Sequence, residues 1–448
     1  MFNLSSNFIK KIKKFFFPFY KNSELKFVFK KLQQGFQNES KVAMFVGGCV
    51  RKYLSNEKID DIDIATSLTT EQIKEKFKDT RFKVIDSGVK HGTVTLVSDK
   101  LKLELTTLRK DVKTDGRHAE IEYTDDWQED SERRDFTINA IYLDIKGKIF
   151  DPQLGVTDLK NCNIKFIGDP QKRIEEDYLR IIRFIRFSLE YVSKIEPTTI
   201  EAIKLNLDGI KKISKERILS ELFKILRIKN FVKLNKNKNL KDIFLLIFPE
   251  LKNLERLSKL EAIMNKSNID REILLAVLLI DETNNYEYFL HKYNVSNDLK
   301  ESLNLMAKNF TQIQSNKKFF LKDLKKNVYF FGKQHLIALN ILYFSNSKKV
   351  KLKDYFNILT SIKKINIPKF SFDGNYLKKN GMENRSLPVL LTTWCLFDWY
   401  NPLVQRAIRS PIFITKVPGT YGAAIHDPSV FWSSNPPEGS CARTVITP

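Results

Sequence analysis

Two aspartates separated by a single residue, Asp61 and Asp63, are the side chains of this sequence best placed to do chemistry. Residues two apart in a β-strand lie on the same face of the sheet, so the two carboxylates would lie side by side. Oxygen ligands suit magnesium, and a pair of such ions can activate an attacking hydroxyl and stabilise a leaving pyrophosphate. We therefore predict that Asp61 and Asp63 are catalytic metal ligands, with Glu104 as the third catalytic carboxylate. An Asp-x-Asp pair alone is a weak signal, since it is usually a solvated strand edge or a helix cap.

A glycine pair, Gly47-Gly48, precedes these aspartates and follows the apolar stretch Val42 to Val46. This pattern predicts a strand that runs into a tight turn, where backbone N–H groups can approach a phosphate closely. Arg51, on the helix expected next, would neutralise a triphosphate. Most Gly-Gly pairs are simple turns, but a Gly-Gly turn followed at this distance by Asp-x-Asp is a far more specific combination.

A second candidate site lies in the stretch EDYLRIIR, where Asp177 and Arg180 are three residues apart. On a helix these two side chains would share a face, so one carboxylate and one guanidinium could address the flat edge of a base. Cytosine and adenine present an amino donor beside a ring-nitrogen acceptor, whereas guanine and uracil present the reverse order. The pair would therefore admit CTP and ATP and reject GTP and UTP. The alternative is a helix-surface ion pair between Glu176 and Arg180.

Several motifs, taken in chain order, resemble those of class II tRNA nucleotidyltransferases and bacterial poly(A) polymerases. They are GGCVR, DID, ELTTLR, DGRH, RRDFTINA, DPQLGVTDL and EDYLRIIR, and the stretch SKERI with Glu221 looks like a further helical motif of the family. The resemblance covers roughly residues 24 to 385 and is densest over 43 to 225. It implies an α/β nucleotidyltransferase head of the polymerase-beta-like type, with a mixed sheet, followed by an all-helical neck, body and tail.

The resemblance also assigns roles to single residues. Asp177 and Arg180 would act as an amino-acid template, and Arg134 and Asp135 would contact the incoming nucleotide just ahead of a strand. Asn139 would lie near the sugar, and Arg183 would add positive charge near the triphosphate.

Two features of the motif set leave questions open. The segment Asp115 to His118 resembles a mobile loop of the family, although an ordinary exposed turn explains it equally well. Lys52 stands where the family usually has Asp, and we interpret it as the loss of a supporting ion pair rather than of a metal ligand.

The charge of the chain agrees with a polyanionic partner. Its 76 Lys and Arg against 53 Asp and Glu give a formal net charge of +23, which favours RNA, although a coding bias that enriches Lys is an alternative. The four cysteines lie far apart and suggest neither a disulfide framework nor a zinc site. This cysteine usage fits a reducing cytoplasm, where we expect the protein to be located. No apolar run is long enough to cross a bilayer, so we expect no stable membrane association.

The periodicity of apolar residues predicts the helices and strands that position these residues. The expected helices span 24 to 36 and Thr70 to Lys78, and the expected strands are Val42 to Val46, Asp61 to Ala65, Phe82 to Ile85, Gly92 to Val97, Leu101 to Thr107 and Ile138 to Asp144. From Pro170 onward the spacing is helical. We divide the chain into a basic leader (1–23), a catalytic head (24–165), a neck with the nucleotide-selecting motif (166–230), and a tRNA-binding body and tail (231–385). Residues 386–448 differ abruptly from the rest in composition. A frameshifted or chimeric end would explain this difference, and a disordered appendage is the alternative.

The expected reaction adds CMP, CMP and AMP, from CTP and ATP, to the 3′ end of tRNA, with Mg²⁺ as cofactor and release of pyrophosphate. The alternatives are a poly(A) polymerase adding AMP to RNA 3′ ends, an enzyme that adds only A or only CC, and a catalytically inactive RNA-binding protein. The stretch His91 to Thr95 resembles the tRNA enzymes more than the polymerases.

Overall fold

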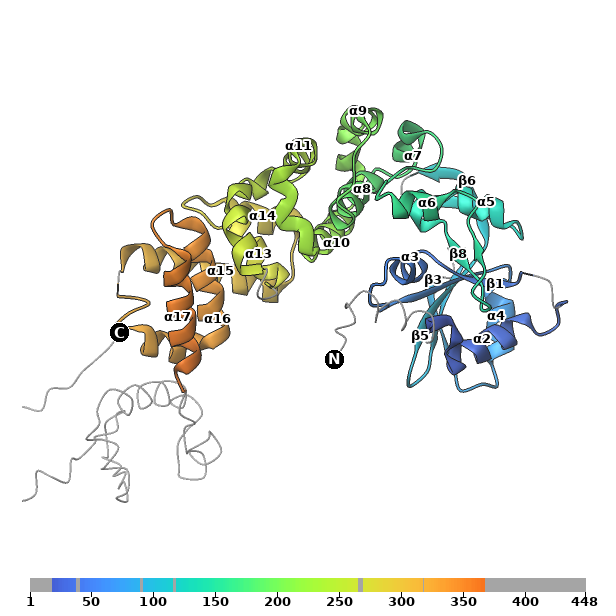
Figure 1. Ribbon diagram of the computed structural model, residues 1–448, viewed down its shortest axis with the longest axis horizontal. Helices are drawn as coiled ribbons and strands as arrows, with labels where there is room; N and C mark the ends of the chain where they lie inside the picture. The colour runs from blue at the N-terminus through green and yellow to red at the C-terminus, as the bar shows by residue number, and fades with distance from the viewer. Residues whose placement is uncertain are drawn as a thin grey trace, which may run out of the picture. The chain divides into compact units, whose positions relative to one another are not determined.

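A seven-stranded mixed sheet forms the centre of the N-terminal head (Figure 1). The computed structural model describes residues 18–37, 41–88, 92–115, 118–264, 269–316 and 318–366. The strand order is β3-β4-β5-β2-β1-β8-β9, and only the β2·β5 pair is parallel. The strands are β1 (Ala43–Val46), β2 (Ile62–Thr66), β3 (Lys83–Gly88), β4 (Thr93–Val97), β5 (Lys102–Thr107), β8 (Tyr142–Leu143) and β9 (Ile149–Phe150).

The two faces of this sheet have different roles. In β5, Leu103 and Leu105 are buried while Glu104 is exposed, as alternation in a half-covered strand requires. The apolar face packs into one core with helices α2 (Ser23–Gln33) and α4 (Thr70–Phe77), which lie against it in Figure 1. The opposite face therefore keeps the polar side chains of β2 and β5.

The first five expected strands are confirmed, with shifts of one to three residues at their ends. The sixth expectation is wrong over most of its length. Thr137–Asn139 forms a 3₁₀ helix (η3), and the only strand there is β8. The reason is local, because the Asp135 carboxylate accepts hydrogen bonds from the Phe136 N–H and the Asn139 amide and so holds the chain in a tight turn.

A separate hairpin, β6 (Arg109–Asp115) and β7 (His118–Tyr123), was not expected from the sequence. It occupies the segment that resembles the mobile loop of the family. Gly116 and Arg117, at the centre of that segment, lie outside the described residues, as does the C-terminal segment from residue 367 onward.

The remainder of the described chain is helical, apart from isolated bridges, which confirms the expected change after Pro170. The head also contains α3 (Gly48–Leu54), α5 (Trp127–Glu132) and α6 (Gly155–Lys160). The later helices are α7 (Pro170–Glu176), α8 (Leu179–Glu190), α9 (Pro197–Leu205), α10 (Lys215–Leu226), α11 (Lys238–Ile247), α12 (Leu257–Met264), α13 (Arg271–Leu279), α14 (Asn285–Tyr293), α15 (Asn297–Ser315), α16 (Leu324–Asn346) and α17 (Leu352–Lys364).

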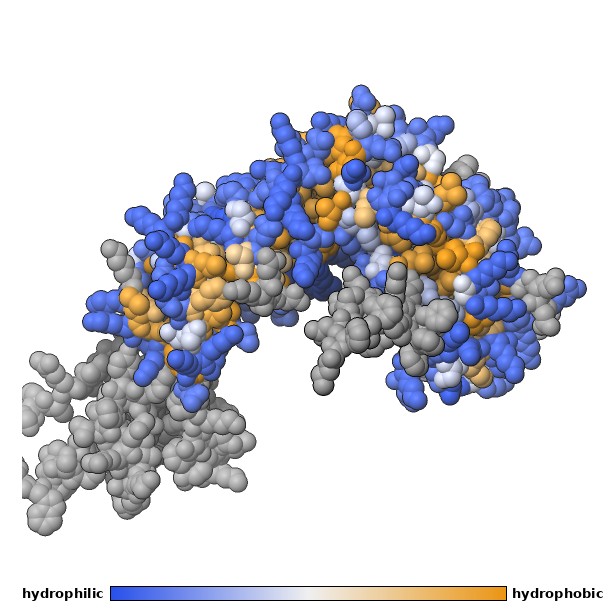
Figure 2. Space-filling view, viewed as in Figure 1, coloured by the Kyte–Doolittle hydropathy of each residue, from blue (hydrophilic) through white to orange (hydrophobic). Residues whose placement is uncertain are grey.

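Packing of the helical part is centred on α13, in which every residue from Leu274 to Leu279 is buried. A helix that is apolar all round must be enclosed by others, and α10, α14, α15 and α16 all contact it. Hydrophilic side chains cover much of the face drawn in Figure 2. Among the described residues, no helix is both long and apolar enough to cross a membrane.

Candidate active site

The parallel pairing of β2 and β5 places Asp63 directly opposite Glu104. Asp61 lies just before β2 and is exposed, as is Glu104. Burial and, to a smaller extent, the negative charges of Glu104 and Asp61 together raise the pKa of Asp63 to about 6, against the opposing effect of Arg134. The structure thus brings the three predicted carboxylates together, and we call Asp61, Asp63 and Glu104 the carboxylate cluster.

The donor set of this cluster matches a hard divalent cation in kind and charge. Its ligands are oxygens, and the pKa of Asp63 is raised by burial first and by the negative charges of Glu104 and Asp61 second. In the part of the chain that the structure describes, no three Asp, Glu, His or Cys side chains are arranged to hold one metal ion. Magnesium commonly takes only one or two protein carboxylates and completes its shell with water and substrate phosphates, so two aspartates suffice.

The predicted glycine turn lies directly over this cluster. Gly47 has a positive φ of 70°, which glycine adopts without strain, and Gly48 begins α3. A Cβ atom added to Gly47 would lie 3.7 Å from the Asp63 Oδ2 atom. The turn therefore brings bare backbone close to the carboxylate that faces Glu104.

Arg51 belongs to α3 but is held by groups outside that helix. Its Nε donates to the Tyr191 hydroxyl at 2.8 Å, and its Nη1 donates to Asn139 Oδ1. Asn139 in turn donates through Nδ2 to Asp135 at 2.8 Å. Three of the predicted nucleotide-binding residues, Arg51, Asn139 and Asp135, are thus linked by hydrogen bonds next to the glycine turn.

Sequence reasoning missed Asp130, which holds Arg133 and Arg134. Asp130 is fully buried, and its oxygens accept from Arg133 Nε at 2.8 Å, Arg134 Nη2 at 2.9 Å and the Tyr142 hydroxyl at 2.7 Å. Burial alone would raise the pKa of Asp130, but the two arginines bring it well below its usual range. The signal was present in the sequence, since Asp130 stands three and four residues before the arginines at the end of α5.

The predicted nucleotide contact Asp135 forms an ion pair with Arg183 of α8, whose Nη2 lies 2.6 Å from Asp135 Oδ2. Arg183 also lies 3.8 Å from Glu221 of α10, which accepts from Arg186 Nε at 2.8 Å. Burial would raise the pKa of Asp135, but Arg183 and Asn139 lower it to about 2. We call Asp135, Arg183, Arg186 and Glu221 the ion-pair network.

The expectation that Asp177 and Arg180 share one helix is wrong. Helix α7 ends at Glu176, Asp177 has extended backbone angles, and α8 begins at Leu179. The break has a local cause, because the Asp177 carboxylate accepts from the Leu179 N–H at 3.2 Å and so forms a side-chain turn just ahead of α8.

Asp177 and Arg180 also have separate partners. Asp177 Oδ2 accepts from Arg217 Nη2 at 2.8 Å, a contact from α10 that sequence reasoning missed although it had singled out the SKERI stretch. Arg180 is buried and donates to Glu176 Oε2 at 2.5 Å and to the Arg173 carbonyl at 2.7 Å. The alternative Glu176–Arg180 ion pair is therefore present, and base reading by Asp177 and Arg180 stays a prediction.

Lys52, which stands where the family usually has Asp, forms an ion pair of its own. Its Nζ lies 2.9 Å from Asp60 Oδ2, the residue just before Asp61. The pair is partly solvated, since the Asp60 side chain is 57% exposed.

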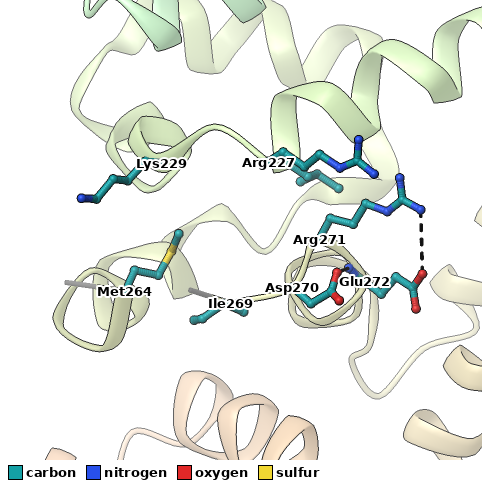
Figure 3. Close-up of a pocket in the computed structure, with 8 residues that line it drawn as sticks. Arg227, Lys229, Met264, Ile269, Asp270, Arg271 and Glu272 are labelled. Carbon is teal, nitrogen blue, oxygen red and sulfur yellow. Dashed lines mark hydrogen bonds and ion pairs between the residues drawn. The ribbon is translucent and has the colours of Figure 1, made fainter. Parts of the chain in front are cut away.

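A pocket in the helical part, shown in Figure 3, is lined by a different set of residues. Arg227 and Lys229, near the end of α10, form one side of it, and Met264, Ile269, Asp270, Arg271 and Glu272 form the other. Leu226 also lines the pocket. None of the predicted site residues lines it, so the pocket does not mark the candidate active site.

Comparison with known proteins gives this geometry a family. Residues 43–165 match the model of the poly A polymerase head domain, and residues 194–254 match the model described as the probable RNA and SrmB-binding site of polymerase A. The chain is 47% identical over 201 residues to the human mitochondrial CCA tRNA nucleotidyltransferase 1, a match that covers 44% of this chain and 46% of the human protein. That match thus spans less than half of the human relative.

A longer match covers most of another relative. The chain is 35% identical over 342 residues to the CCA-adding enzyme of Staphylococcus haemolyticus, which is 74% of this chain and 80% of that protein. The fold is similar to that in the crystal structure of the Bacillus stearothermophilus CCA-adding enzyme in complex with CTP, with a TM-score of 0.57 at 22% identity over 86% of this chain and 98% of that one. The chain therefore belongs to the family of the CCA-adding enzymes, template-independent nucleotidyltransferases with a polymerase-beta-like head.

Proposed function

We propose that this protein adds CMP, CMP and AMP, taken from CTP and ATP, to the 3′ end of tRNA and releases pyrophosphate. The observation that carries the proposal is the placement of Asp63 opposite Glu104 beneath the Gly47 turn. That arrangement puts unbalanced carboxylates next to backbone that can approach a phosphate, as a nucleotidyl transfer site requires.

Asp61 and Asp63 would hold magnesium, the cofactor we propose for the reaction. When bound, such ions activate the attacking 3′ hydroxyl and neutralise charge on the leaving pyrophosphate. The chain's own contribution is to position the nucleotide. The Gly47 turn and Arg51 would bind the triphosphate, and Arg134, fixed by Asp130, would add positive charge near the cluster.

Selection of CTP and ATP is proposed to rest on Asp177 and Arg180, which precede and begin α8. Because these side chains now bond to Arg217 and Glu176, a base would have to compete with those partners. A base of the wrong donor and acceptor order would leave buried polar groups unpaired, which is the basis of strong rejection. Asp135 and Asn139 would support this site by tying the head to α8.

The proposed polymer partner is tRNA, bound by the basic helical body through its phosphates and shape. The human relative is named mitochondrial, so the cytoplasmic location expected from the sequence is a separate proposal. A poly(A) polymerase remains the second candidate, because residues 43–165 match the model named for that enzyme's head domain.

One experiment separates these functions. The full chain is incubated with tRNA that lacks its CCA end, and with each labelled nucleotide singly and in combination. We expect incorporation of CMP, followed by AMP only when CTP is also present. Repeated AMP addition without CTP would favour the poly(A) polymerase, and no incorporation of either nucleotide would contradict both functions.

A further inference from the structure

Arg51 is a buried cation whose contacts are all neutral. Only 6% of the residue is exposed, yet its guanidinium bonds to the Tyr191 hydroxyl and the Asn139 amide oxygen and lies 4.7 Å from the centre of the Phe187 ring. A buried charge is normally matched by an opposite charge, because desolvation is costly. Within the described residues, no carboxylate lies at ion-pair distance from Arg51.

Two neighbouring arginines show the usual behaviour. Arg183 and Arg186 also lie over the Phe187 ring, with guanidinium carbons 5.7 Å and 4.0 Å from its centre. Both form ion pairs, with Asp135 and Glu221 as the main partners. Of the three cations around this ring, Arg51 is the one whose charge is not balanced by contact.

The charge of Arg51 lies beside the glycine turn. The Arg51 N–H donates to the Gly47 carbonyl at 3.0 Å, so the side chain leaves α3 within one turn of Gly47. Arg51 also lowers the pKa of Asp63, although burial of Asp63 has the larger, opposite effect. A positive charge that is buried, unpaired and close to the carboxylate cluster suits an anionic ligand.

We propose that Tyr191 is a positioning residue for nucleotide binding, which holds Arg51 without neutralising it and so keeps its charge available for a triphosphate; this rests on the function proposed above. Tyr191 directly follows α8, whose first turn carries Arg180. Its bond to Arg51 therefore joins the helix of the base-selecting motif to the helix of the glycine turn. Burial raises the pKa of Tyr191 to about 12, so its hydroxyl stays neutral near pH 7.

A matched pair of substitutions separates holding Arg51 from neutralising it. In Tyr191→Gln the amide oxygen accepts from Arg51 but carries no charge, whereas in Tyr191→Glu a carboxylate of the same length forms an ion pair. We expect the Glu variant to bind CTP about tenfold more weakly than the Gln variant, with little difference for CMP, because the lost attraction acts on the outer phosphates. Dissociation constants are measured by equilibrium titration of the full chain with CTP and with CMP.

Tyr191→Phe gives a second, smaller test. It removes only the hydroxyl, and we expect CTP affinity to fall about three- to tenfold while CMP affinity changes little, since a hydrogen bond to a charged group is lost. Tyr286→Phe, in α14, is the control, because its hydroxyl bonds to Glu287 far along the chain and should change neither affinity.

The CTP and CMP affinities of these variants decide whether Tyr191 positions Arg51 for nucleotide binding. Equal CTP affinity of the Gln and Glu variants would overturn the role of Tyr191, as would an equal loss of CTP and CMP affinity in Tyr191→Phe, which indicates only structural damage. If the Glu variant does not fold, the Phe variant decides by the same criterion. A wild-type chain that binds no CTP would overturn the proposed function as well, whereas normal wild-type binding with insensitive variants would overturn this inference alone.

Discussion

Carboxylates occur in two contrasting settings in this molecule, the carboxylate cluster of the sheet and the ion-pair network around α8. In the cluster, Asp63 faces Glu104 and its pKa rises to about 6. In the network, Asp135 faces Arg183 and its pKa falls to about 2, even though burial opposes that fall. The difference separates two tasks. A network whose charges are balanced fixes the position of its side chains, whereas a cluster of like charges costs stability and is suited to receive a cation.

The largest expected effect comes from the cluster. Asp63→Asn, which keeps the shape and removes the charge, should lower the rate of CMP incorporation by at least about a thousandfold, because metal binding contributes several kcal/mol to such reactions. Asp61→Ala should behave in the same way. Rates are measured with labelled CTP, and tRNA binding should persist in both variants.

Asp60→Asn is the matched control for the cluster. Asp60 directly precedes Asp61 in the chain, carries the same charge and pairs with Lys52. Incorporation by Asp60→Asn should therefore stay close to the wild-type rate. Retained catalysis in Asp63→Asn would contradict the assignment of the cluster, and loss of catalysis in Asp60→Asn would show that charge near Asp61 matters more than its position.

A substitution in the ion-pair network should instead lower the free energy of unfolding. Glu221, whose side chain is 3% exposed, contacts Arg183, Arg186 and Lys224. Glu221→Gln removes the counter-charge and should lower the free energy of unfolding by about 3–5 kcal/mol, as breaking a buried ion pair does. Urea denaturation measures this, with Glu201→Gln as control, because Glu201 is an exposed residue of α9. A loss below about 1 kcal/mol, typical of surface pairs, would erase the contrast between the two regions.

The two settings should also differ in the sign of their pH dependence. Asp63 has a folded pKa above its ordinary 3.8, so its contribution to stability is complete below pH 3.8 and is lost as the pH rises through about 6. Asp135 has a folded pKa below 3.8, so its contribution is present above pH 3.8 and is lost as the pH falls through about 2. Without divalent cations, Asp63→Asn should therefore become more stable than the wild type at neutral pH, by roughly 1–3 kcal/mol.

Urea titrations between about pH 2 and about pH 7 test this difference, which follows from the two shifted values. Asp135→Asn should be less stable than the wild type at neutral pH, and its deficit should shrink toward acid. If the Asp63→Asn curve ran parallel to that of the wild type, like-charge repulsion in the cluster would be absent.

The contrast also explains what the sequence could predict. Asp61, Asp63 and Glu104 could be predicted because alternation along each strand is a local rule that decides which side chains share a face. The pairing of β2 with β5, which places Asp63 opposite Glu104, is visible only in the structure. The break at Asp177 could not be predicted in this way, because the Asp177 carboxylate bonds to the Leu179 N–H and so competes with continuation of the helix. The bond between Arg51 and Tyr191 joins residues 140 positions apart, and no local pattern reports such a contact. Asp130 was predictable only in part, since the sequence shows its spacing to Arg133 and Arg134 but not its burial.

The smallest expected effect concerns Lys52, which belongs to neither the carboxylate cluster nor the ion-pair network but forms a partly solvated ion pair. Its partner Asp60 is more than half exposed, so the pair should contribute no more than about 1 kcal/mol, and Lys52→Met should change the free energy of unfolding by that amount or less. Double-mutant analysis with Asp60→Asn isolates the coupling, and raising the salt concentration should remove it, because solvated charges are screened. A coupling above about 2 kcal/mol would mean that Lys52 and Asp60 belong with the buried network, and that the segment before Asp61 is fixed as rigidly as Asp135.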